Sequence, residues 1–548
     1  MRQQTERSPQ SITSMVEGTV VAGPSPQEQK RVEPWKSPLF RWLSFGLLLI
    51  LFVCTYYTIG KELLRQTNQT RELRAGSDQL HNMRLATQTR PDLNPNFNHS
   101  FLEPLKNWFP HRTDGVINPL WPWMTAWMVE PGHKISEEEV RDKIFTEETE
   151  KLYERGRNAQ LYMTLGFLLM LGIGAARLFS LAAACNLLLL GAFGVFLPRA
   201  AFFQPEPVYY MFFFLTWVAC VSALNHNSLW IYAFIGILGG IAFLAKGSVQ
   251  PLLVVFVGVS SLRCVWEFFS AQRRGLALGG THLWHWRNHL VGLVFLGAAF
   301  MMTAGPRLRD SYDKFGSMFH SYPGYWMWMD NFKEGYQWMA DHNSKESLQT
   351  IDPQEKPTAW KYFHTHTGQE ALDRLWNGVH SRVGEFFWPK QTIREKSYAK
   401  MLEKHRAWHG LFEWRGIYLG WLALILTGLL TVLATVAPKA EHAGHLVFRH
   451  GTVTIILFVV GSFAAYSLSY GWYAAIAPGS GDRFMLSLYL PLVFSFIWGG
   501  ETIVRRLRRR KSSPWVQWGY LTAQWLLFAA LCWRLVEIVR YPHFFDKV

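Results

Sequence analysis

Residues 229–259 read LWIYAFIGILGGIAFLAKGSVQPLLVVFVGV, two apolar runs separated by one charged residue, Lys246. The blocks 229–245 and 249–267 are each close to the roughly 20 residues that a helix needs to cross a bilayer. They predict a hairpin of two membrane-spanning helices with Lys246 at its turn. Because a cation at membrane depth costs roughly 2.5 to 3.5 kcal/mol, we expect Lys246 to have a partner that offsets this cost.

The rest of the chain has the composition of a membrane protein. Of its 548 residues, 49% are hydrophobic, 16% aromatic and only 17% charged. The apolar residues form blocks of membrane-spanning length, which predicts an all-α polytopic membrane protein with about eleven transmembrane helices. The predicted spans are 42–60, 159–176, 178–197, 207–225, 229–245, 249–267, 289–304, 415–437, 452–475, 483–500 and 516–537.

The net charge of +15 raises the question of a nucleic-acid partner. The densest basic cluster, RRLRRRK at 505–511, lies between two apolar blocks, where the positive-inside rule predicts such residues. With the amino terminus inside, Arg273, Arg274 and Arg287 fall on the same side of the membrane as this cluster. We therefore expect the protein to lie in a lipid bilayer and to bind no nucleic acid. The membrane would be a bacterial inner membrane, with the ends of the spans away from the basic cluster facing the periplasm, or that of the endoplasmic reticulum.

The spacing of the spans predicts four regions. Residues 137–157, in the long first outer loop, have apolar residues at helical spacing and predict an amphipathic helix along the surface. The aromatic-rich segment 305–414 is expected to be either a folded lid or an interfacial layer. The regions are a disordered cytoplasmic tail (1–41), an N-terminal membrane core with outer loop 61–158 (42–304), an extracytoplasmic loop subdomain (305–414) and C-terminal membrane helices (415–548).

Unusual polar residues are predicted at the outer ends of the spans. Lys246 can bind a lipid phosphate beside Gly247 and Ser248, or can snorkel to the headgroups. Glu206, between two prolines, can belong to a site or cap a helix, and Asp114 can be catalytic or a solvated loop residue. The candidates are Asp114 in HRTDGVINPLWPW, Arg199 and Glu206 in LPRAAFFQPEPVYY, Lys246, and Arg483 in GDRF.

These residue types suit transfer from a phosphate-linked donor. A carboxylate base would activate an acceptor hydroxyl, and cations would stabilise the leaving phosphate. Asp114 and Glu206 could also give two oxygen ligands to a divalent metal, whose requirement the sequence leaves open. No Walker or dinucleotide-binding motif is present in the sequence.

Several motifs resemble the integral-membrane glycosyltransferases of the GT-C fold, in the branch of protein O-mannosyltransferases and the lipid A aminoarabinose transferase. They are GGIAFLAKGSVQPLLV, the acidic outer loop after the first span, PEPVYYMFFF and GDRFMLSLYLPLV. The resemblance implies a polyprenyl-phosphate sugar donor and a lipid, polysaccharide or protein acceptor. It implies Asp114 as base, Glu206 as the second acid, and Lys246, Arg483 and Arg199 as candidates to bind the donor phosphate. Many relatives have a second acid after the Asp, where this chain has Gly115.

Two other classes of function stay open from the sequence. A transporter or lipid flippase also needs polar groups inside a helix bundle, although the notable charges here fall on one side and no two-fold repeat is visible. A non-catalytic envelope scaffold would use the 305–414 segment to bind partners, with the charged residues serving only the fold.

Overall fold

The computed structural model describes residues 38–69, 77–89, 110–142, 144–226, 228–273, 283–387, 406–436, 450–477, 483–509 and 514–540. All regular structure in these ranges is helical. The chain divides into two units between Leu47 and Leu48. The described part of the first unit is only the start of the first helix, and every site discussed below lies in the second.

Ten helical segments in the described ranges are long and apolar enough to cross a membrane, which confirms an all-α polytopic membrane protein. The eleventh predicted span, α11 (Leu229–Ala245), is apolar but has only 17 residues. The ten are α1 (Pro38–Gln69), α7 (Glu147–Leu178), Leu181–Ala200, α10 (Glu206–Asn225), α12 (Gln250–Arg273), α13 (Leu283–Phe315), α20 (Arg406–Val436), α22 (His450–Tyr473), α23 (Tyr489–Arg509) and α24 (Pro514–Arg540). Leu181–Ala200 consists of α8 (Leu181–Gly191), a π-helical turn and α9 (Leu197–Ala200).

The first helix begins earlier than the sequence predicted. Residues 38–41, which we had assigned to the tail, form the first turn of α1. Proline is well suited to a first helical position because the amide it lacks would have no partner there, and Pro38 is the first residue of α1. The rest of the predicted tail, 1–37, lies outside the described residues.

The predicted amphipathic surface helix over 137–157 is wrong. The structure has a short α6 (Glu137–Asp142), and residues 147–157 are the first turns of the spanning helix α7. Thr146 determines this start, because its side chain accepts the Thr149 amide, and three glutamates follow in the first turn. After this cap α7 continues without interruption to Leu178.

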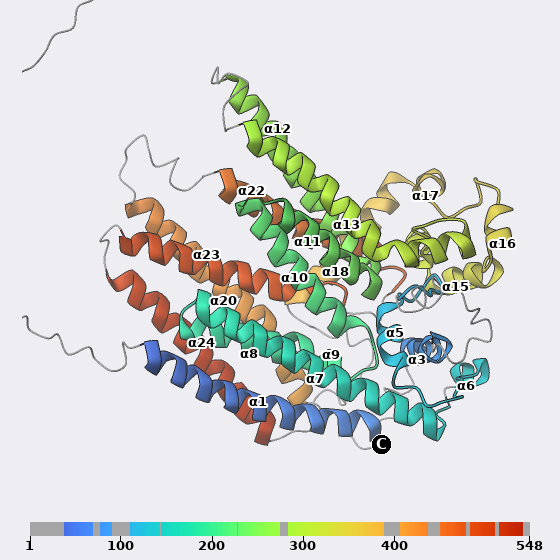
Figure 1. Ribbon diagram of the computed structural model, residues 1–548, viewed down its shortest axis with the longest axis horizontal. Helices are drawn as coiled ribbons and strands as arrows, with labels where there is room; N and C mark the ends of the chain where they lie inside the picture. The colour runs from blue at the N-terminus through green and yellow to red at the C-terminus, as the bar shows by residue number, and fades with distance from the viewer. Residues whose placement is uncertain are drawn as a thin grey trace, which may run out of the picture. The chain divides into compact units, whose positions relative to one another are not determined.

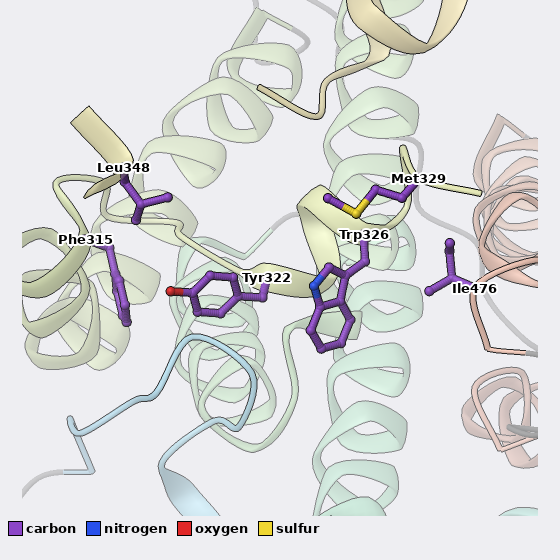
Figure 2. Close-up of a cluster of buried hydrophobic side chains, with 6 residues drawn as sticks. All are labelled: Phe315, Tyr322, Trp326, Met329, Leu348 and Ile476. Atoms are coloured by element: carbon purple, nitrogen blue, oxygen red, sulfur yellow. The ribbon is translucent and has the colours of Figure 1, made fainter. Parts of the chain in front are cut away.

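Residues 322–387 are folded. They form α14 (Tyr322–Trp326), α15 (Phe332–Asp341), α16 (Lys345–Gln349), α17 (Ala359–Thr365) and α18 (Gly368–Phe387). Figure 2 shows Tyr322 and Trp326 of α14 between Phe315 and Leu348 on one side and Ile476 on the other. Since α13 continues to Phe315, the first part of the predicted 305–414 subdomain belongs to a spanning helix.

Helices α11 and α13 are neighbours (Figure 1), and glycines of α11 form their contact. A Cβ added at Gly236 would lie 2.3 Å from the Leu296 carbonyl oxygen, and one at Gly240 would lie 2.7 Å from Thr303 Cβ. Small residues allow such close approach of helix backbones in membranes. Gly236 and Gly240 thus allow the Lys246 hairpin to pack against α13.

Replacing Gly236 with alanine should destabilise the protein by about 1 to 3 kcal/mol, the usual range for forcing an extra carbon into a packed contact. Thermal unfolding in detergent measures this change. The matched control is Gly297→Ala in α13, where an added Cβ meets nothing within 4 Å. Equal unfolding temperatures for the two variants would show that the α11–α13 contact does not depend on glycine.

Candidate functional site

Lys246 lies at the turn of the predicted hairpin and has a partner from its own chain. It ends α11 in an extended conformation, and one 3-10 turn over Gly247–Val249 leads into α12. Its ammonium lies 2.8 Å from Oε1 of Glu206, and the side chains are 18% and 4% exposed. Burial lowers the pKa of Lys246, and the Glu206 carboxylate opposes this shift. A buried ion pair therefore offsets the cost of the cation.

Glu206 also interacts with two further cations. It opens α10, where a carboxylate is favoured by the helix dipole, and it interacts electrostatically with Lys246, Arg483 and Arg199. Arg483 Nη1 in turn lies 3.0 Å from Oδ2 of Asp78. We call Lys246, Arg483, Arg199, Glu206 and Asp78 the ion cluster. Its three cations and two carboxylates leave one formal positive charge.

An aromatic ring lies beneath two of these cations. The Lys246 ammonium is 4.8 Å, and the Arg483 guanidinium carbon 5.0 Å, from the centre of the Phe484 ring. Phe484 stacks on Tyr470 with 5.0 Å between ring centres. Such contacts attract cations to the ring face, so Phe484 helps to hold the two side chains at one place.

Asp78 is the member of the ion cluster that the sequence analysis missed. It lies in the first turn of α3 (Ser77–Thr89), in a polar stretch that reads as an ordinary helix start. The next residue, Gln79, is buried, and its Oε1 accepts the Phe203 amide at 2.7 Å. This bond ties α3 to the segment before Glu206. Since Arg483 is 405 residues away in sequence, no local pattern signals the contact.

Buried Arg157 is a second residue that the sequence analysis missed, and it positions the same segment. Its guanidinium donates to the carbonyls of Leu64 at 3.4 Å and Ala201 at 3.3 Å. It also lies 4.0 Å from the centre of the Tyr153 ring. Arg157 thereby ties α1 and α7 to the connection that carries Arg199 and Glu206.

Asp114 belongs to a turn and not to the ion cluster. Its Oδ1 accepts the amides of Val116 at 2.8 Å and Ile117 at 2.7 Å. Gly115 follows with a φ of +85°, a conformation that favours glycine, and its carbonyl accepts the Tyr322 amide at 2.9 Å. This geometry explains why glycine follows Asp114.

Asp114 and Asp78 nevertheless line the same cavity, which has a volume of about 1020 Å³. Its aromatic lining includes Tyr322, Tyr336 and Phe315. Burial raises the pKa of Tyr336, and the charges of Asp78 and Asp114 raise it further, so this phenol lies near both carboxylates. The volume is at the upper end of that of small-molecule pockets, and Asp78 connects the cavity to the ion cluster.

The structure thus unites four of the five residues predicted for the site, Glu206, Lys246, Arg483 and Arg199, and leaves Asp114 at the adjoining cavity. Among the described residues, no group of three or more His, Cys, Asp or Glu side chains is arranged to hold a metal ion.

The comparisons with known proteins add no relative. No protein-family model matches the chain, and no curated protein matches its sequence. The class that the fold defines is therefore a polytopic helical membrane protein with a cationic cluster where helices begin and end, beside an acidic cavity.

Proposed function

We propose that this protein is a membrane glycosyltransferase that moves a sugar from a polyprenyl-phosphate carrier to an extracytoplasmic acceptor. The observation that supports it best is the pairing of two features: an ion cluster with an excess of cations, and an adjoining cavity whose lining includes the carboxylates of Asp78 and Asp114. The acceptor would be a lipid, polysaccharide or protein, and the setting a bacterial inner membrane with the cavity toward the periplasm.

The ion cluster suits the phosphate of the donor. Arg483 has the planar fork of donors that matches phosphate oxygens, and Lys246 adds a compact positive charge. Both are partly exposed, at 23% and 18% of their side-chain surface. Their place beside a spanning hairpin suits a phosphate on a lipid whose chain stays in the bilayer.

The cavity suits the sugar and the acceptor. A carboxylate would take the proton of an acceptor hydroxyl while that oxygen attacks the anomeric carbon. The bond from this carbon to the phosphate oxygen breaks, and the electron pair leaves with the phosphate. The cations of the ion cluster stabilise the charge that develops there.

Two carboxylates are candidates for the base. The resemblance to GT-C enzymes suggested Asp114, but Oδ1 of Asp114 is engaged by two backbone amides of its turn. Asp78 contacts Arg483 and lines the same cavity, which puts it closer to the phosphate-binding side chains. This geometry favours Asp78 as the base, with Asp114 as the alternative.

The test is transfer of radiolabelled sugar from synthetic polyprenyl-phosphate donors by the purified protein, with membrane extracts as acceptors. We expect a covalent labelled product from the wild type and at least a tenfold lower rate from Arg483→Gln, which loses the phosphate fork. Labelled donor that crosses liposome membranes without forming product would instead establish a flippase. If neither product nor flux is seen with any donor, the scaffold becomes the better explanation.

A further inference from the structure

The two carboxylates of the ion cluster are held differently. Glu206 is 4% exposed and paired with Lys246 at the start of a spanning helix. Asp78 is 49% exposed and lines the cavity, and its side chain contacts Arg483. The Asp78 side chain is therefore the one that can leave its cation with little disturbance.

One donor of the Arg483 guanidinium has no acceptor in the described part of the chain. Its Nη1 contacts Asp78, whereas its buried Nε has no hydrogen-bond partner among the described residues. Its backbone is fixed, because its carbonyl accepts the Tyr210 hydroxyl at 2.6 Å. A bidentate ligand would accept hydrogen bonds from the Nε and an Nη of the guanidinium together. Asp78 accepts only from Nη1, so the Nε donor is not used.

We propose that a polyprenyl phosphate binds Arg483 by displacing Asp78, which releases this carboxylate into the cavity. The inference rests on the proposed function and deepens it. A phosphate offers several oxygens and at least one negative charge, and it can occupy the fork that Asp78 occupies only in part. Because Gln79 holds α3 through Phe203, the exchange needs only rotation of the Asp78 side chain.

The exchange couples the two halves of the reaction. A general base must lie within hydrogen-bond reach of the proton that it takes. Without donor, Oδ2 of Asp78 is engaged by Arg483 at 3.0 Å. Once the phosphate binds Arg483, the Asp78 carboxylate can turn toward the hydroxyl of the acceptor, so the donor binds before the acceptor is activated.

The test measures binding of a fluorescent polyprenyl phosphate to the full chain in detergent. Because Asp78 competes with the phosphate, Asp78→Asn should bind the probe about three- to tenfold more tightly than wild type. Asp142→Asn is the matched control, since Asp142 pairs with Arg141 at 3.0 Å, is 48% exposed, and neither lines the cavity nor contacts Arg483. This variant likewise loses one negative charge from an Asp–Arg pair. Its affinity should equal that of wild type.

A second pair of variants tests the route through Arg483. In an Arg483→Gln background the probe should bind more weakly, and adding Asp78→Asn should bring no further tightening. Inorganic phosphate should compete with the probe in wild type and less well in Arg483→Gln. Competition by neutral polyprenol alone would show that only the lipid chain is recognised, which overturns the exchange.

The outcomes separate this inference from the proposed function. Equal affinity of Asp78→Asn and wild type, in a protein that transfers sugar, would overturn the exchange and leave the transferase standing. Tighter binding by Asp78→Asn, in a protein that never transfers sugar, would support the exchange and refute the transferase. Absence of probe binding by both proteins would refute both.

Discussion

Replacing Asp78 with asparagine should reduce sugar transfer by about 10²- to 10⁴-fold, the usual contribution of a general base. The substitution keeps the shape of the side chain and removes the carboxylate that accepts the proton. The measurement is the initial rate of radiolabel transfer at saturating donor. Since donor binding should tighten in the same variant, the loss should appear in kcat and not in KM for the donor.

The matched comparison is Asp114→Asn. Asparagine keeps an oxygen that can accept the Val116 and Ile117 amides, so the turn should persist. We expect less than about a tenfold loss of transfer, because Asp114→Asn leaves the carboxylate that acts as the base in place. A large loss in Asp114→Asn with near-normal transfer in Asp78→Asn would assign the base to Asp114.

Replacing Lys246 with methionine should destabilise the protein by about 3 kcal/mol, because breaking a buried ion pair leaves an uncompensated charge. The Glu206 carboxylate that remains is only 4% exposed. Thermal unfolding in detergent measures the loss. Donor binding should fall as well, since one of the cations of the ion cluster is gone.

Two further variants isolate the buried pair. The double variant Lys246→Met with Glu206→Gln should recover most of the lost stability, because neither charge remains, but it should not recover transfer. Lys151→Met is the surface control: the pair of Lys151 with Glu147 is exposed and should contribute less than about 1 kcal/mol. Equal stability of Lys246→Met and Lys151→Met would show that Lys246 does not depend on Glu206.

The apolar pattern of the chain was enough to predict the helical membrane class and the position of Lys246 between two helices. Apolar blocks of spanning length have few alternatives in a bilayer, because a helix satisfies its backbone hydrogen bonds internally. The same physics located Glu206 at the start of α10 and Lys246 between α11 and α12. The prediction was wrong where a spanning helix extends beyond its apolar block, as at residues 147–157 of α7. The polar residues of such an extension do not indicate that they belong to the span.

The pairing of charged side chains depends on how the helices pack, and the sequence did not predict it. The partner of Lys246 is 40 residues away in sequence and the partner of Asp78 is 405 residues away. Neither distance leaves a local periodicity or motif. The structure also distinguishes Asp114, whose side chain accepts a backbone amide of its own turn, from Asp78, whose side chain contacts Arg483. Ion pairs between distant segments form where helix packing brings the side chains together. The order of residues in a single sequence shows no pattern from which such a pairing can be predicted.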